Sequence, residues 1–206
     1  MNKFQLLEHL KKLGFSSKIL DAFSIVGREE FLPFELESQA YEDTALPIGN
    51  GQTISQPYTI ALMLSELDLK KGQKVLEAGS GSGYVLALIS SIIGKSGKVF
   101  GLEIISKLAK RSKKNLIGYK NARVYNKNGY LGLPEEAPFD RILLSAAVRE
   151  IPKNLLEQLK DNGILVAPIG PRFEQKITVI QKKGNEIIKK SEISGFIFVP
   201  FVEGEN

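Results

Sequence analysis

The chain has 206 residues, 43% of them hydrophobic and none of them cysteine, with a formal net charge of +5. This length and composition predict one compact domain with a hydrophobic core, and they exclude a disordered chain, disulfides and thiolate-based nucleophiles or zinc sites. Because no apolar run approaches about eighteen residues and the N-terminal segment lacks the apolar core of a signal peptide, we expect a cytoplasmic protein with no membrane span.

Two helices and a long loop are expected at the start of the chain. Asn2 predicts the N-cap of a first helix that ends at Gly14, and a second helix begins near Ser16. Residues 41–57, YEDTALPIGNGQTISQP, are rich in Gly, Pro, Thr and Ser and show no periodicity, which predicts a loop. Loops of this length inside compact domains are usually functional. A helix over about 57–67 follows, with proline at its first turn.

The middle of the chain is dominated by a strand, a glycine turn, a helix and a second strand. The first strand covers 74–78, the helix runs to about Ile93, and the second strand ends at an acid, Glu103. The turn carries three alternate glycines, which bring backbone amides close to a ligand at the helix start: Gly79, Gly81 and Gly83. A strand-end carboxylate can accept two hydrogen bonds from ribose hydroxyls. The unit therefore predicts a nucleoside-containing cofactor.

The glycine spacing indicates which cofactor this is. A dinucleotide site needs G-x-G-x-x-G, and Tyr84 stands where its third glycine would be, so a dehydrogenase is disfavoured. Glu77, two residues before the first glycine, would repel a pyrophosphate but suits the α-amino group of a methionine moiety. The pattern E-x-G-x-G-x-G resembles the S-adenosylmethionine site of Rossmann-like methyltransferases, in which Ser80 and Ile104 would also contact the cofactor. A glycine-rich turn of another α/β protein is the alternative.

The rest of the chain continues the alternation of strands and helices. We expect helices over 106–118 and 152–159, strands over 122–125, 139–144, 164–168, 176–181, 186–190 and 196–199, and a hairpin turn at 183–185. The fold class is therefore α/β, a doubly wound, mostly parallel sheet with antiparallel C-terminal strands and an N-terminal helical segment. Ligands bind outside the carboxyl ends of such strands, where the glycine turn, Glu103, Asn128-Gly129 and 145–147 converge. Within the one domain we distinguish 1–56, 57–170 and 171–206.

Several segments together resemble one family over nearly the whole chain, the protein-L-isoaspartate O-methyltransferases. They are I-G-x-G-Q-T-I-S-Q-P (48–57), which general methyltransferases lack, NGYLGLPEEAPFDRILLSAA (128–147) and a terminal FVPF (198–201). The resemblance implies methyl transfer from S-adenosylmethionine to the α-carboxylate of L-isoaspartyl residues in damaged proteins and peptides. It also implies a monomer, with no nucleic acid, membrane or metal involved.

The resemblance assigns roles to individual residues. It makes Ser55 the catalytic serine, and it implies substrate contacts from the loop, from the segment after the fourth strand and from the C-terminal rim: Gln52, Thr53, Ile54, Ala146, Ala147 and Val199. Asn128, with Gly129, stands where the family commonly has an aspartate that meets the adenine amino group. Asn50 stands where an aromatic residue or histidine is frequent. An asparagine oxygen accepts the same hydrogen bond without charge assistance, which predicts weaker cofactor binding.

The chemistry of a carboxylate nucleophile agrees with these residue types. A carboxylate is already ionised at neutral pH, with a reference pKa of about 4, so no general base is needed and catalysis reduces to orientation. We expect Ser55, helped by Thr53 and loop amides, to hold the substrate carboxylate. The alternative is that Ser55 only caps the helix beginning at Pro57.

Two other functions stay open. The positive charge would suit an RNA substrate, although the lysines are spread in a way that favours a solvated surface, and Ser-Ala-Ala at 145–147 lacks the polar motif expected for base methylation. Asn128 favours a non-catalytic S-adenosylmethionine-binding module, whereas the intact loop at 51–55 argues against one.

Overall fold

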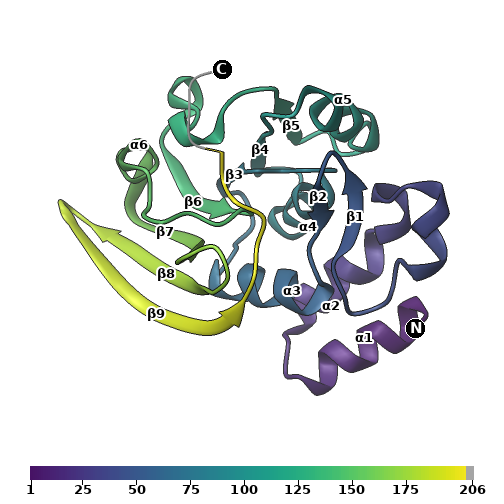
Figure 1. Ribbon diagram of the computed structural model, residues 1–206. Coiled ribbons are helices and arrows are strands. Elements are labelled where there is room, and N and C mark those ends of the chain that lie inside the picture. The colour runs from purple at the N-terminus through teal and green to yellow at the C-terminus, as the bar shows by residue number, and fades with distance from the viewer. Residues whose placement is uncertain (203–206) are drawn as a thin grey trace.

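Seven strands form one mixed sheet in the computed structural model, which describes residues 1–202 (Figure 1). Their order is β5-β4-β3-β6-β7-β8-β9, with the neighbours from β5 to β7 parallel and β8 and β9 antiparallel. The bounds are β3 Lys74–Ala78, β4 Lys98–Leu102, β5 Ala122–Tyr125, β6 Phe139–Leu144, β7 Leu159–Ile169, β8 Gln175–Lys183 and β9 Glu186–Phe196. The predicted strands 74–78, 122–125 and 139–144 are confirmed, and so is the doubly wound, mostly parallel fold.

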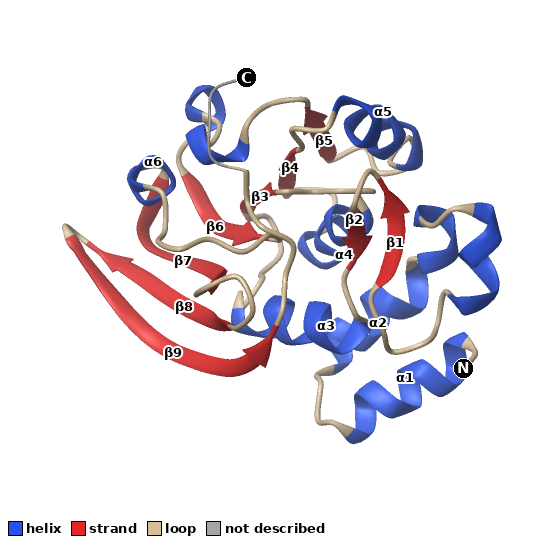
Figure 2. Ribbon diagram, viewed as in Figure 1, coloured by secondary structure: helices blue, strands red, loops and turns tan. Residues whose placement is uncertain are grey.

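Helices cover both faces of this sheet (Figure 2). They are α1 Lys3–Lys12, α2 Ser17–Ile25, α3 Pro57–Glu66, α4 Tyr84–Ile93, α5 Ser106–Asn115 and α6 Lys153–Glu157, with short 3-10 turns η1 Arg28–Phe31, η2 Phe34–Gln39, η3 Gly129–Leu131 and η4 Pro134–Glu136. Val75 of β3 belongs to a core cluster with α2, α3 and α4, whereas the next residue, Leu76, belongs to a second cluster with α6. Because successive strand residues point to opposite faces, the sheet has a core on each side.

The predicted first helix and its caps are confirmed. Asn2 accepts a hydrogen bond from the Gln5 amide and forms a capping box with that residue. The helix ends at Lys12, and Gly14 follows with φ +89, the left-handed conformation in which helices commonly end. The second helix is confirmed as α2, which begins at Ser17 after Ser16 at its N-cap.

The prediction of a loop over 41–57 is wrong in part, because the segment contains a small antiparallel hairpin. Its strands are β1 Leu46–Gly49 and β2 Gln52–Ile54, and the turn between them places Gly49, Asn50 and Gly51 at positive φ. Strands of three and four residues are too short to show periodicity in the sequence. The hairpin pairs with itself and not with the main sheet.

The C-terminal boundaries also differ from the prediction. The helix expected over 152–159 ends at Glu157, because Leu159 already pairs with Phe139 and begins β7. The strands expected over 186–190 and 196–199 are wrong as separate elements, since β9 runs without interruption from Glu186 to Phe196. Between residues 197 and 202 the described chain forms no strand, and Pro200 makes an isolated bridge with Ala147. The hairpin turn at 183–185 is confirmed.

Across residues 1–202, the structure has no helix with the length and apolar character needed to cross a bilayer.

Candidate active site

A cavity opens at the carboxyl ends of β3, β4 and β6, and two adjoining pockets form it. Both pockets are lined by β2, the glycine turn and the segment after β6: Thr53, Gly79, Gly81 and Ser145. The first, which we call the serine pocket, is also lined by Ile54, Ser55, Glu77, Ser80, Tyr84 and Phe198. The second, the Glu103 pocket, is also lined by Gln52, Glu103, Ile104, Asn128, Gly129, Ala146 and Val199. Most of the predicted site residues therefore meet in one cavity.

The glycine turn is shaped by backbone conformations that other residues rarely adopt. Gly79, Gly81 and Gly83 have φ values of +85, +52 and +91. The amides of Gly79 and Ser80 donate to the Leu102 carbonyl at 2.9 and 3.0 Å, which ties the turn to β4. Gly83 lines neither pocket, although it was predicted as a cofactor residue. Instead it caps α4, and a Cβ there would lie 2.5 Å from the Ser112 hydroxyl.

Glu103 lies directly after β4, and backbone amides hold its carboxylate in place. Its Oε2 accepts from the Gly81 amide and its Oε1 from the Ile105 amide, both at 2.8 Å. Burial raises the pKa of this carboxyl above its ordinary value, and these amide bonds oppose the shift. Each carboxylate oxygen has a further lone pair after one amide bond, so Glu103 fits the predicted role of accepting from ribose hydroxyls.

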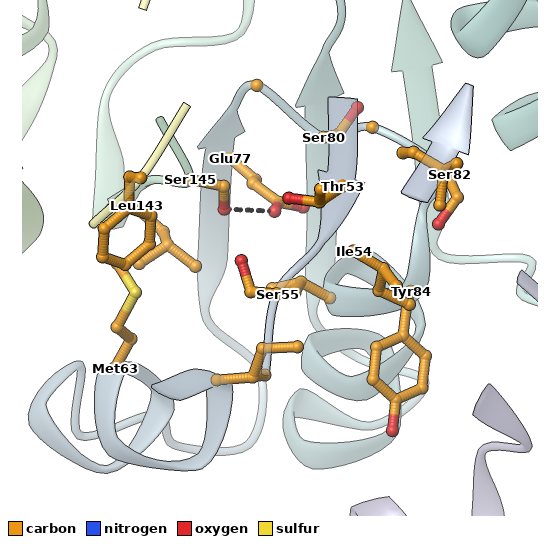
Figure 3. A pocket seen from close by; sticks show the side chains of 16 residues that line it. Thr53, Ile54, Ser55, Met63, Glu77, Ser80, Ser82, Tyr84, Leu143 and Ser145 are labelled. Atoms are coloured by element: carbon orange, nitrogen blue, oxygen red, sulfur yellow. Dashed lines mark hydrogen bonds between the residues drawn. The ribbon is translucent and has the colours of Figure 1, made fainter. Parts of the chain in front are cut away.

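Glu77 is the most deeply buried acid of the cavity, with an exposed fraction of 1%. Its Oε1 accepts from the Ser145 hydroxyl at 2.6 Å (Figure 3), and its Oε2 has no hydrogen-bond partner among residues 1–202. Burial raises the pKa of Glu77 to about 8; the Ser145 bond lowers it, and the neighbouring Glu103 charge raises it further. A buried acceptor with a spare oxygen fits a cationic amino group, which would return this carboxyl to its ionised form.

Ser55 follows β2 and lines the serine pocket (Figure 3). In Figure 3 its hydroxyl points toward the Glu77–Ser145 pair. Ser55 also lines a third pocket, the β9 groove, which is formed by the end of β9 and the residues after it, by the hairpin and by the start of α3: Thr44, Thr53, Gln56, Thr59, Phe196 and Val199. Ser55 therefore lies where the serine pocket and the β9 groove meet.

The alternative role of Ser55, capping α3, does not match the structure. The N-cap residue of α3 is Gln56, and it makes no side-chain capping bond. The Tyr58 amide in the first turn donates instead to Oδ1 of Asp43 at 2.8 Å. Asp43 thus performs the capping from a distant segment, and sequence reasoning missed it because no local spacing links the two positions.

Asn128 and Gly129 lie at the end of the Glu103 pocket, as expected from the order of the strands. The Asn128 Oδ1 accepts from the Tyr130 amide at 2.9 Å and so caps the short η3 turn. Ala146 lines the Glu103 pocket, but Ala147 lines a separate pocket beside Arg149 and Arg172. Ala147 therefore lines neither of the two cavity pockets, although its amide donates to the carbonyl of Val199, another predicted substrate residue, at 2.8 Å.

A left-handed glycine turn, a buried acid before it and a second acid after the next strand are typical of the S-adenosylmethionine site of a Rossmann-like methyltransferase. The sequence model of one methyltransferase family, protein-L-isoaspartate(D-aspartate) O-methyltransferase, matches residues 1–206. The chain belongs to this family.

Individual relatives agree with the family match. A protein-L-isoaspartate O-methyltransferase of Fervidobacterium nodosum is 44% identical over 197 residues, which is 95% of this chain and 98% of that protein. A solved protein-L-isoaspartate O-methyltransferase structure has a TM-score of 0.90 at 33% identity, covering 98% of this chain and 66% of its own. A putative enzyme of the same name from Plasmodium falciparum, solved with S-adenosyl-L-homocysteine, has a TM-score of 0.87 at 30% identity and covers 99% of this chain and 100% of its own.

Proposed function

We propose that this protein transfers a methyl group from S-adenosylmethionine to the α-carboxylate of L-isoaspartyl residues in damaged proteins and peptides. The observation that carries the proposal is the position of Ser55, which lines both the serine pocket beside Glu77 and the β9 groove. One hydroxyl thus lies where a substrate carboxylate entering by the groove would meet the cofactor side of the cavity. The family match and the relatives' names support this substrate.

The cofactor side of the cavity is assigned to residues that fit its chemical groups. Glu77, held by Ser145, would accept from the α-amino group, and Glu103 would accept from the ribose hydroxyls. Asn128 and Gly129 would meet the adenine. When bound, S-adenosylmethionine supplies an electrophilic methyl group on a sulfonium.

The substrate side requires orientation and no proton transfer. A carboxylate with a reference pKa of about 4 is ionised at neutral pH, so the residues around it need only hold one oxygen toward the methyl group and keep water out. Ser55 and Thr53 offer hydroxyl donors for this task, and both side chains project into the serine pocket in Figure 3. Hydroxyl donors bind a carboxylate without neutralising its charge. A cytoplasmic location and a monomeric state stay predictions.

Methyl transfer to a matched pair of peptides tests the proposal. The two peptides are identical except for isoaspartate or aspartate at one position, and the methyl group of S-adenosylmethionine carries the label. We expect base-labile label on the isoaspartyl peptide alone, because a methyl ester hydrolyses in base. Absence of label on both, with S-adenosylhomocysteine still bound in calorimetry, would contradict the proposal and favour a binding module or another substrate.

A further inference from the structure

Arg28, in η1, is fully buried, and among residues 1–202 its guanidinium donates to backbone carbonyls alone. Nη1 donates to Ala40 at 2.8 Å and to Glu42 at 3.3 Å. Nη2 donates to Thr44 at 2.9 Å and to Ser55 at 3.0 Å. Burial lowers the pKa of Arg28 to about 10, so the side chain is still a cation at neutral pH.

The four carbonyls lie at the two ends of the hairpin. Three of them precede β1, and the fourth belongs to Ser55, directly after β2. The planar fork of a guanidinium can reach several acceptors at fixed angles, which the single ammonium of lysine cannot. Arg28 therefore closes the base of the hairpin, which has no strand partner in the main sheet.

A second contact fixes the residues that follow Ser55. Asp43 accepts from the Tyr58 amide at 2.8 Å and from the Gln56 side chain at 3.1 Å. The backbone of Ser55 is thus held through its own carbonyl by Arg28 and through the next residues by Asp43. The Ser55 side chain is left to face the pocket (Figure 3).

We infer that Arg28 is a positioning residue for methyl transfer, which sets where the Ser55 hydroxyl and the rim of the β9 groove stand relative to the cofactor side of the cavity. The inference rests on the proposed function. Arg28 lines neither the serine pocket nor the Glu103 pocket, so its replacement should reduce turnover and leave cofactor affinity unchanged. A displacement of about 1 Å can cost about 100-fold in rate when catalysis depends on orientation.

Arg141 provides a matched control. It is also buried and also donates to carbonyls, to Leu67 at 2.7 Å and to Asp68 at 3.2 Å, but it lies near the start of β6, at the opposite end of that strand from the cavity. Replacing either arginine removes a buried guanidinium from several carbonyls. Only the replacement of Arg28 removes hydrogen bonds from the two ends of the hairpin.

The experiment compares Arg28→Met, Arg28→Lys and Arg141→Met for kcat on the isoaspartyl peptide, S-adenosylhomocysteine affinity and Tm. We expect kcat to fall about 100-fold in Arg28→Met and about tenfold in Arg28→Lys, with affinity within about threefold of wild type. Arg141→Met should have a lower Tm than the wild-type protein but a kcat within about threefold of it. If Arg28→Met does not fold, the kcat and cofactor affinity of Arg28→Lys test the inference.

A kcat for Arg28→Lys within threefold of wild type, or an equal loss of kcat in Arg141→Met, would overturn the inference. Loss of cofactor affinity in parallel with kcat would also overturn it, since that result would indicate general damage to the fold. Failure of the proposed function is distinguishable, because the wild-type protein itself would then leave the isoaspartyl peptide unlabelled.

Discussion

The glycine turn after β3 and the β1–β2 hairpin form adjoining walls of one cavity by different physical means. The turn belongs to the main sheet: its amides bind β4 and Glu103, and Gly83 lies against Ser112 of α5. The hairpin belongs to no larger sheet and is held by two charged side chains, Arg28 and Asp43. The cofactor wall is thus held by backbone amides that bind the neighbouring strand and its end, and the substrate wall by charged side chains that bind the hairpin and the segments beside it.

The largest effect on stability is expected when alanine replaces a glycine of the turn, Gly83. The matched comparison is the same replacement in the hairpin, at Gly49. Gly83 and Gly49 share a φ of +91, in the region that other residues rarely adopt, so a side chain is strained at both. A Cβ at Gly83 would meet Ser112 at 2.5 Å, whereas at Gly49 nothing lies within 4 Å. We expect Gly83→Ala to cost about 2–5 kcal/mol in the free energy of unfolding and Gly49→Ala about 1–2 kcal/mol. Equal losses in urea denaturation would break the comparison between the two walls.

The next effect concerns the pH dependence of stability without cofactor. Burial raises the pKa of Glu77 to about 8, whereas the unfolded chain ionises this carboxyl near pH 4.5. The stability contributed by the protonated form is fully present below about pH 4.5 and is lost as the pH rises through 8. The free energy of unfolding should fall by up to about 1.4 kcal/mol per pH unit across this window.

Glu77→Gln removes this ionisation and keeps an oxygen that can accept from Ser145. Urea denaturation from pH 5.5 to 7.5 should therefore show a stability difference between Glu77→Gln and wild type that grows with pH in favour of the variant. Parallel pH curves would show that Glu77 is already ionised in the folded protein.

The smallest effect is expected on cofactor affinity, when Asn128 on the cofactor wall is replaced. Asn128→Asp keeps an oxygen that can accept from the Tyr130 amide and adds charge to the acceptor expected to meet adenine. Charge-assisted hydrogen bonds are about twice as strong as neutral ones, so S-adenosylhomocysteine should bind about two- to fivefold more tightly in calorimetry. Unchanged kcat with saturating cofactor would be the companion result. Weaker binding would show that repulsion from Glu103 outweighs the gain.

The sequence predicts the cofactor wall well because its signals are local. Glu77, Gly79 and Gly81 lie on one short segment, and Glu103 follows at the end of the next strand. The spacing alone therefore implies that these residues meet. The bounds of β3, β5 and β6 are also marked locally, since each is a short segment with apolar residues between turns.

The substrate wall could not be derived in the same way. Arg28 binds the Ser55 carbonyl across 27 residues, and Asp43 binds the Tyr58 amide across 15, and no periodicity reports such contacts. The role of Ser55 came from family resemblance, not from spacing, and the hairpin strands were too short to detect. The misplaced strand at 196–199 has a related cause: Phe198 is held by the Gln175 side chain and not by a strand ladder.

Ser55→Ala, measured for both kcat on the isoaspartyl peptide and S-adenosylhomocysteine affinity, tests most directly that the two walls have separate tasks. The Ser55 hydroxyl lies on the substrate side and makes no hydrogen bond to the glycine turn within residues 1–202, so kcat should fall about 10- to 100-fold while affinity stays within about twofold. Undiminished turnover, or loss of turnover and cofactor affinity together, would contradict this account.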